Sequence, residues 1–255
     1  MYKAIMTFFL LALPLLGAAQ EVSSIPKYNM ETIKRLNVKE VSFADSRPGE
    51  RQIDSMFNSM QIPFNKIDVA NWPGYDYDPL VEFRIAYSAD EIYLQYHVIE
   101  PCVKAVYSED AGSAPYKDSC LEFFCIPHSN DSTYYNLEMN CIGIGTFAGG
   151  AKRTERTRFQ DDVLSQIRRY STLGKEAFGI KESNGEPFEY TLTVAIPLKL
   201  YSLSQMEPLK GRTIKANFYK CGDEMPEKHY FSWNPIGTER PNFHTPQYFG
   251  ELYFE

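Results

Sequence analysis

Short runs of β-branched and aromatic residues, separated by Pro, Gly, Asn and Asp, constrain this sequence more than any other feature. A turn at Ser88-Ala89-Asp90 suits a hairpin between two of the runs, and helical patterns occur only near residues 50–58 and 197–203. The pattern predicts an all-β fold, a β-sandwich or jelly roll of antiparallel strands with one or two short helices. The expected strands cover residues 39–43, 80–87, 91–99, 119–126, 134–144, 188–196, 213–219 and 248–254.

Two segments leave the secondary structure less determined. Residues 154–169 are charged and suit a helix, although residues 167–170 could equally begin a strand. The string from Gly143 to Ala148 matches the G-x-G-x-x-A dinucleotide pattern. Because Gly149 and Gly150 follow where a helix should begin, we interpret the string as a glycine-loosened strand end or hairpin.

The first 20 residues have the layout of a secretory signal peptide. One lysine precedes an apolar run over residues 4–16, and small residues follow at 17–19. That run is too short for a bilayer core, which needs about 20 apolar residues. We therefore expect cleavage near Ala19, a single mature domain over residues 20–255, no membrane span, and a periplasmic or secreted protein. An uncleaved anchor or a buried N-terminal helix is the alternative.

Composition excludes several classes of protein. Charged residues make up 23% and hydrophobic residues 44% of the 255, a balance that is typical of globular chains and not of disordered ones. The formal net charge of −7 argues against a nucleic-acid partner, because phosphate binding depends on an excess of Lys and Arg.

Alternation within two strands predicts a polar sheet face. In residues 91–98 and 134–140, apolar side chains for the core alternate with polar ones. Planar hydrogen-bonding groups on one face suit sugar hydroxyls, which both donate and accept, although an ordinary solvated face is the alternative. The expected face carries Tyr93, Gln95, His97, Asn136, Glu138 and Asn140, with Arg84 and Glu122 from neighbouring strands.

Catalytic motifs are scarce. The four histidines lack metal-protease spacing, no G-x-S-x-G elbow occurs, and the order of acidic residues cannot show which pair would face a cleft. The five cysteines form no C-x-x-C pair, which makes a zinc or redox site improbable, and their odd number allows two disulfides at most. Cys120 and Cys125 have opposite parity on one strand and so cannot pair with each other there. Most cysteines are expected to be small buried hydrophobes.

Several segments together resemble the family 9-like carbohydrate-binding modules, in the version found in exported Bacteroidetes proteins. The resemblance covers residues 38–254, and its motifs are more specific together than singly. It rests on PLVEFRIAY at 79–87, EIYLQYHVIE at 91–100, KDSCLEFF at 117–124, YYNLEMNCIG at 134–143, YFSWNPI at 230–236, PNFH at 241–244 and YFGEL at 248–252.

The resemblance implies a β-sandwich that binds saccharides without cleaving them. In the founding modules two Trp rings clamp a terminal sugar and calcium supports the loops, so structural calcium is possible here, with no other cofactor expected. Trp72, with Tyr75 close by, and Trp233 both lie on turn-rich segments, where they could either bind sugar or cover the core. Asp118 and Glu122 match the family motif best.

Three functions remain in competition at this point. The first is an exported, non-catalytic protein that recognises a poly- or oligosaccharide through loop aromatics and the polar sheet face. The second is a hydrolase of O-glycosyl bonds in polysaccharide catabolism, or a protein associated with one, so enzymatic activity stays uncertain. The third is a haem protein with His97 and Met139 as axial ligands.

Overall fold

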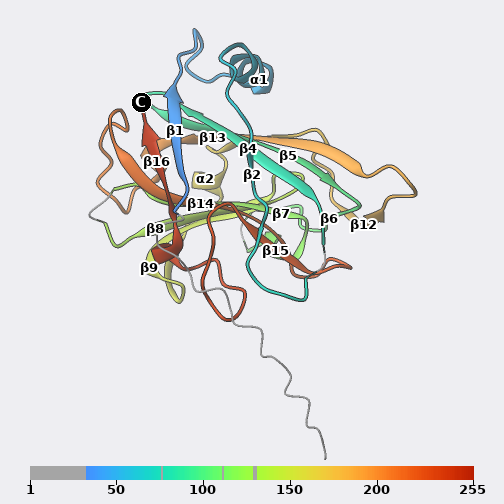
Figure 1. Cartoon of the computed structure of the whole chain (residues 1–255). Coiled ribbons are helices and arrows are strands. Elements are labelled where there is room, and N and C mark those ends of the chain that lie inside the picture. The colour runs from blue at the N-terminus through green and yellow to red at the C-terminus, as the bar shows by residue number, and fades with distance from the viewer. Residues whose placement is uncertain (1–32, 76, 111, 129–130) are drawn as a thin grey trace, which may run out of the picture.

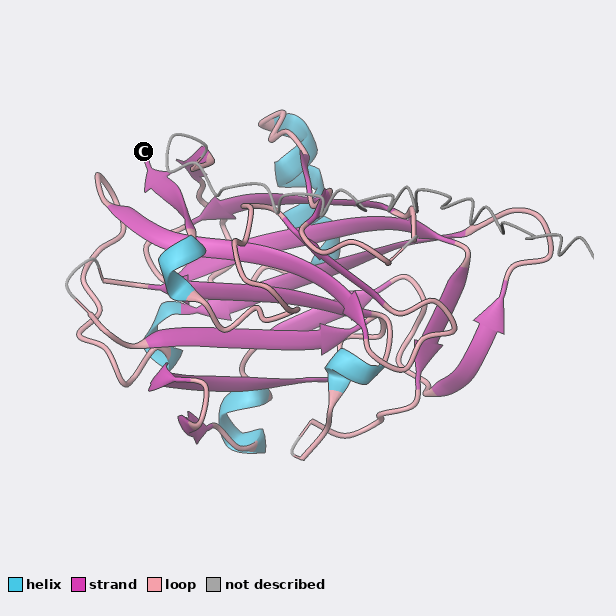
Figure 2. Cartoon of the chain, turned by 60° about the horizontal axis from the view of Figure 1, so that its bottom comes forward, coloured by secondary structure: helices cyan, strands magenta, loops and turns pink. Residues whose placement is uncertain are grey.

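The strands form one long, mostly antiparallel sheet that curls into two facing layers (Figure 1). The computed structural model describes residues 33–75, 77–110, 112–128 and 131–255. The expected signal peptide therefore lies outside the described residues. Figure 2 shows the short helices at the margins of the stacked strands. The predicted β-sandwich with few helices is confirmed.

The first layer carries the strands that later form the candidate site. Its hydrogen-bonded order is β10-β9-β8-β7-β14-β16, with β15 and β3 added beside β14. The bounds are β3 (Val69–Ala70), β7 (Cys120–Ile126), β8 (Tyr134–Asn140), β9 (Gly145–Lys152), β10 (Glu155–Arg158), β14 (Thr213–Gly222), β15 (His229–Ser232) and β16 (Gly250–Phe254).

The second layer continues from the first through β1 (Arg35–Glu40), which runs parallel to β16 at one end and to β4 at the other. Helix α1 (Glu50–Ser59) packs on the outer face of this layer (Figure 1). Helix α2 (Asp161–Leu164) is short, and β6 (Cys102–Ala105) pairs separately with β12 (Phe178–Glu182). The remaining strands of the second layer are β2 (Asn65–Lys66), β4 (Leu80–Tyr87), β5 (Glu91–Glu100), β11 (Arg168–Ser171) and β13 (Phe188–Pro197).

Alternation along each strand creates the core between the layers. On β7, Leu121 and Phe123 point inward, and on β4 Phe83 does the same. Phe83 stacks on Phe218 of β14 with ring centroids 3.6 Å apart, which joins the two layers directly. The core forms because the period-2 pattern gives each strand one apolar face that only the opposite layer can cover.

Most of the expected elements are confirmed, with informative exceptions. Residues 80–87 form β4, and the helix near residues 50–58 is α1. The segment 154–169 contains strand β10, helix α2 and the start of β11, so both interpretations were partly right. The Gly143–Ala148 string is a turn followed by β9, with Gly143 at φ 86°. The strand expected at 39–43 was wrong, because β1 is placed at Arg35–Glu40 by parallel partners distant in sequence.

A buried ion pair ties the layers together at one end. Lys220 Nζ lies 2.9 Å from Glu100 Oε2, and both side chains are fully buried. The hydroxyls of Tyr77 and Tyr190 each donate to the Glu100 carboxylate at 2.8 Å. Burial, and then the charge of Lys220, lowers the pKa of His229 to about 2, so neutral His229 Nε2 accepts from Lys220 Nζ at 2.8 Å. Every charged group in this network therefore has a partner.

Among the residues that the structure describes, no helix combines the length and the apolar character that crossing a membrane would require.

Replacing Lys220 tests this network. Lys220→Met leaves the Glu100 carboxylate buried without its cation, and we expect the free energy of unfolding to fall by about 3–5 kcal/mol in urea titrations. Lys210→Met is the matched control, because Lys210 pairs with Glu40 at the surface and should change stability little. A loss for Lys220→Met no larger than that of the control would contradict the role of the pair.

Candidate functional site

A pocket of about 700 Å³ opens on the outer face of the first layer. Its floor comes from β7, β8 and β14, and its walls come from β10 and from loops around residues 112–116 and 241–244. The lining residues are Gly112, Ser113, Ala114, Tyr116, Glu122, Asn136, Glu138, Thr146, Ala148, Arg153, Arg156, Arg158, Cys221, Asp223, Tyr230, Pro241, Asn242, Phe243 and His244.

Two carboxyl groups lie opposite each other on the pocket floor. Glu122 of β7 is in register with Glu138 of β8, and both side chains are buried. Burial raises the pKa of Glu122 well above its usual value, and Cys221 and Glu138 raise it further. The pKa of Glu138 is also raised by burial, against the opposing effects of Asn136 and Arg156. The floor can therefore present both a protonated carboxyl and hydrogen-bond acceptors.

Asn136 and Arg156 hold the floor in position. Asn136 Nδ2 donates to Glu138 Oε1 at 2.7 Å, and Asn136 Oδ1 accepts from Arg156 Nε at 3.0 Å. The guanidinium of Arg156 lies 4.0 Å from the centroid of the Tyr134 ring, and it also donates to the Tyr134 carbonyl at 2.9 Å. These contacts fix the orientation of the amide and the carboxylate before any ligand arrives.

The walls carry aromatic rings and positive charge. Tyr116 is 39% exposed, and Tyr230 and Phe243 stand on the walls with ring centroids 6.0 Å apart. Arg153 and Arg158 are exposed at the rim, and within the described residues neither makes an ion pair. The Ser113 hydroxyl is buried and has no hydrogen-bond partner there. The pocket thus combines a ring surface with polar groups that remain available to a ligand.

The expected single polar face is split between opposite sides of the sandwich. Arg84, Gln95 and His97 belong to β4 and β5, so they lie on the outer face of the second layer. Arg84 Nε donates to Gln95 Oε1 at 2.8 Å, and its Nη2 pairs with Asp54 of α1 at 2.9 Å. The sequence prediction was wrong here because period-2 alternation identifies an outer face but does not say which layer the strand joins.

His97 is held by two carboxylates. Its ring nitrogens lie 2.9 Å from Glu82 and 2.8 Å from Glu189. Although burial lowers the pKa of His97, these hydrogen bonds raise it above its usual value. Met139 points into the core instead, so the structure does not bring the haem candidates His97 and Met139 together.

Asp118 and Asn140 lie next to the pocket but serve the backbone. Asp118 Oδ2 accepts from Val106 N at 2.9 Å and from Asn140 Nδ2 at 3.1 Å. Asn140 Oδ1 accepts from Ile144 N at 3.0 Å and so closes the turn before β9. Both side chains are fully buried. Their position indicates a role in fixing the loops, not contact with a ligand.

The two tryptophans are buried. Trp233 is 3% exposed and lies in the core, with its ring edge-on to Phe83 and Phe218. Trp72 is 5% exposed, and its Nε1 donates to the Thr238 carbonyl at 2.8 Å. In this conformation neither indole offers a free face to a sugar, as the expected clamp would require.

Trp72 nevertheless lies behind the pocket wall. Its ring centroid is 6.1 Å from those of Tyr230 and Phe243, and Tyr75 packs edge-on against Tyr230 at 5.0 Å. Trp72 and Tyr75 therefore support the wall from behind.

Sequence reasoning missed the residues of the walls. Tyr116 immediately precedes the segment 117–124 and Tyr230 begins the segment 230–236, both of which carry the family resemblance, so their place at those motifs was a usable signal. Arg153 and Arg158 lie in or next to the charged segment 154–169 and belong to no motif in the sequence. Only the pairing of β10 with β9 places them beside the pocket.

Among the described residues, no cluster of His, Cys, Asp or Glu side chains has the donor set of the calcium site that the family resemblance raised. Calcium prefers six to eight oxygen ligands. Within the described residues, one group of three or more His, Cys, Asp or Glu side chains lies close enough to hold a cation, and it consists of Cys120, Glu122 and Cys221. Two sulfur donors do not suit calcium.

His244 in the pocket wall should make stability depend on pH. Burial, and then Arg156 and Arg153, lowers its pKa to about 3 from 6.5. Between these two values the unfolded chain binds a proton that the folded chain does not, so the free energy of unfolding falls as the pH falls through this window. His244→Gln should flatten the curve of unfolding free energy against pH by up to about 1.4 kcal/mol per pH unit there.

His97→Gln is the control for that measurement, because the pKa of His97 is shifted in the opposite direction. The contribution of His97 to the free energy of unfolding is present below about pH 6.5 and is lost as the pH rises through the raised pKa of His97 in the folded chain. Removing His97 should therefore change the slope only above that pH. If the two variants altered the same pH range, the assignment for His244 would be wrong.

A solved structure from Bacteroides uniformis, provisionally described as a carbohydrate-binding protein, has 40% sequence identity and a TM-score of 0.82. The match covers 88% of this chain and 100% of that one. No curated protein matches the chain significantly.

Two structures of a family 9 carbohydrate-binding module from Caldicellulosiruptor kristjanssonii share the fold. The complex with glucose has 15% identity and a TM-score of 0.53, covering 87% of this chain and 96% of that one. The complex with cellotriose has 14% identity and a TM-score of 0.55, covering 87% and 94%. The sequence pattern of carbohydrate-binding family 9 matches residues 51–254. The chain therefore belongs to carbohydrate-binding family 9.

Proposed function

We propose that this chain is an exported, non-catalytic protein that binds a poly- or oligosaccharide in the pocket of the first layer. One observation carries the proposal: the exposed Tyr116 lines the same pocket as the planar polar groups of Glu122, Asn136 and Glu138. Membership of a carbohydrate-binding family, and the sugars bound by structural relatives, support the same conclusion.

The chemistry of the pocket fits sugar hydroxyls. A protonated carboxyl on the floor donates a hydrogen bond, and the carbonyl oxygen beside it accepts one, as each hydroxyl requires. The Tyr116 ring offers an apolar surface for the C–H face of a pyranose. Arg153 and Arg158 at the rim add donors, and no ion pair engages either side chain within the part of the chain that the structure describes. A ligand would be oriented by the floor and held by the wall.

This proposal assigns the predicted residues different roles. Glu122, Asn136 and Glu138 contact the sugar directly. Trp72 and Tyr75 act indirectly, because they pack behind Tyr230. Tyr116 and Tyr230, which line the pocket, take the role of contacting the sugar that the sequence predicted for the two tryptophans.

The test is calorimetric titration of the purified chain with a panel of mono-, oligo- and polysaccharides, followed by variants. Tyr116→Ala should weaken affinity about tenfold, because the stacking surface is lost while the floor is intact. Tyr253→Ala is the matched control: Tyr253 is 43% exposed on β16, outside the pocket lining. Equal affinity in the two variants would remove Tyr116 from the site, and no binding by the wild type to any sugar would overturn the proposal.

A glycoside hydrolase is the second candidate, since Glu122 and Glu138 are two buried carboxyls with raised pKa in one pocket. One oxygen of each carboxyl group is already engaged, however: Glu122 Oε1 accepts from Cys221 Sγ at 3.2 Å and Glu138 Oε1 accepts from Asn136 Nδ2 at 2.7 Å. We expect no release of reducing ends from any polysaccharide that binds. Turnover that disappears in both Glu122→Gln and Glu138→Gln would instead establish the hydrolase.

Export is tested separately. The proposal expects the protein in the periplasm or medium with an N-terminus that begins at about Gln20. Finding the full-length chain inside the cell would contradict that part alone.

A further inference from the structure

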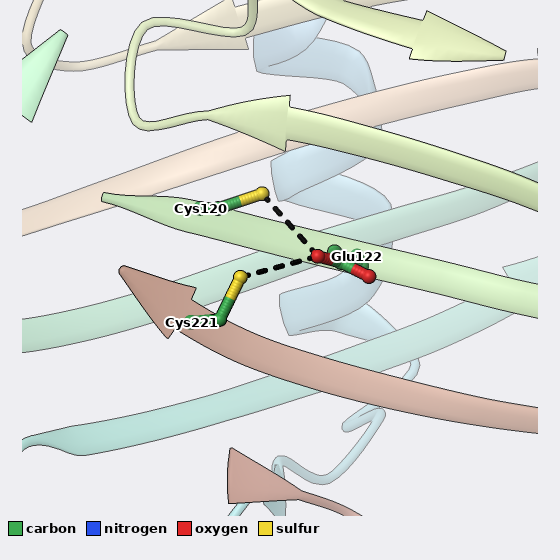
Figure 3. A group of neighbouring side chains, drawn as sticks. All are labelled: Cys120, Glu122 and Cys221. Carbon is green, nitrogen blue, oxygen red and sulfur yellow. Dashed lines mark hydrogen bonds between the residues drawn. The ribbon is translucent and has the colours of Figure 1, made fainter. Parts of the chain in front are cut away.

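Two thiols and a carboxyl group converge beside the pocket floor. Cys120 and Glu122 come from β7, and Cys221 comes from the neighbouring strand β14 (Figure 3). Glu122 Oε1 lies 3.6 Å from Cys120 Sγ and 3.2 Å from Cys221 Sγ. All the ligand atoms of this group lie within 4.8 Å of one another, and all three side chains are buried. We refer to these three residues as the thiol–carboxylate group.

The register of the strands creates this group. Cys221 pairs directly with Cys120 across the antiparallel β7–β14 ladder, so their side chains leave the sheet on the same face. Glu122 lies two residues after Cys120 and therefore shares that face. The absence of a C-x-x-C motif in the sequence argued against a zinc site. This absence does not bear on Cys120 and Cys221, because they are neighbours only across strands.

The distances fit a tetrahedral metal centre. Zinc binds Cys sulfur at about 2.3 Å and carboxylate oxygen at about 2.0–2.2 Å, so a tetrahedral arrangement separates sulfur from oxygen by about 3.5 Å. The two observed separations of 3.2 and 3.6 Å lie on either side of that value. Small side-chain rotations would bring all three donors to one ion.

The group has an open direction for a fourth ligand. Glu122 and Cys221 line the pocket, while Cys120 lies behind them. Three protein ligands with a fourth position facing a solvent-filled pocket are the arrangement of accessible zinc sites, as opposed to closed structural ones. The pocket also provides a path by which an ion can enter.

A second observation, independent of these distances, indicates that the site beside Glu122 would stabilise a cation. Glu138 of β8 stands directly opposite Glu122, so two carboxyl groups share one buried position on the sheet. Like charges that face each other across a ladder destabilise it unless protons or a cation neutralise them. A divalent ion bound beside Glu122 would supply this neutralising charge.

We propose that Cys120, Glu122 and Cys221 bind one thiophilic divalent cation, of which Zn²⁺ is the representative, with its fourth coordination position open to the pocket. Binding converts two thiols to thiolates and releases their protons to solvent, so affinity falls as the pH is lowered. The proposal does not rest on saccharide binding: Glu122 belongs to both sites, but Cys120 and Cys221 are not assigned to the sugar, and the readouts of metal binding are measured without any saccharide.

Co²⁺ is the spectroscopic probe. The purified chain, fully reduced and freed of metal, is titrated with Co²⁺ and then with Zn²⁺. We expect one equivalent of Co²⁺ to produce a thiolate-to-cobalt charge-transfer band and the visible bands of tetrahedral cobalt, and Zn²⁺ to abolish both. Zn²⁺ should also slow the reaction of two thiols with an alkylating reagent.

Variants then identify the ligands. Cys120→Ser and Cys221→Ser should each weaken Zn²⁺ affinity at least 100-fold, and Glu122→Gln at least tenfold. Cys125→Ser is the matched control, because Cys125 lies on the same strand with its side chain in the core. It should retain both the cobalt spectrum and the wild-type affinity. Thermal melting of each variant without metal establishes that it is folded.

Three results would overturn the proposal. The first is the absence of a charge-transfer band in the reduced wild type, which needs no variant to fold. The second is unchanged Zn²⁺ affinity in the Cys120→Ser, Cys221→Ser double variant. The third is a Cys120–Cys221 disulfide in the isolated protein whose reduction yields thiols that still bind no metal. Failure of the sugar titration would leave each of these measurements unaffected.

Discussion

The antiparallel register between β7 and β14 is the constraint on which the rest of the structure depends. It sets Phe123 against Phe218 on the inner face, where their rings stack at 5.0 Å and continue to Phe83 of the second layer. The same register sets Glu122 against Tyr219 and Cys120 against Cys221 on the outer face. A slip of one residue would exchange the two faces, so a single pairing determines both the core and the pocket floor.

Burial explains the chemistry on both sides of this ladder. Inside, the Lys220–Glu100 pair is fully enclosed and survives because tyrosine hydroxyls and His229 satisfy its remaining polar atoms. On the outer face, Glu122 and Glu138 are also buried, but they oppose each other and their pKa values rise. The Lys220–Glu100 pair is neutralised by its own residues. The carboxyl groups of Glu122 and Glu138 have no such partner within the described residues and are available to a sugar or a cation.

The sequence predicted the site only in part, for a physical reason. Alternation correctly placed Asn136 and Glu138 away from the core, and the D-S-x-x-E-F-F motif added Glu122. The alternation of residues also assigned Arg84, Gln95 and His97 to the same surface. In the structure these side chains lie on the second layer, against α1 or between carboxylates. Alternation depends on neighbours two residues apart, whereas membership of a layer depends on which distant strand a segment pairs with.

The sequence by itself determined the β-sandwich class, the positions of most strands, the outward direction of the floor residues and the resemblance to the family. Each of these follows from local periodicity or from a contiguous motif. Tertiary structure alone decided that Trp72 and Trp233 are covered, that Tyr116 and the rim arginines line one pocket, and that Cys120 lies beside Cys221. Cys120 and Cys221 lie about 100 residues apart in the sequence, and the burial of each tryptophan depends on which loop covers its ring. No local sequence pattern encodes these contacts.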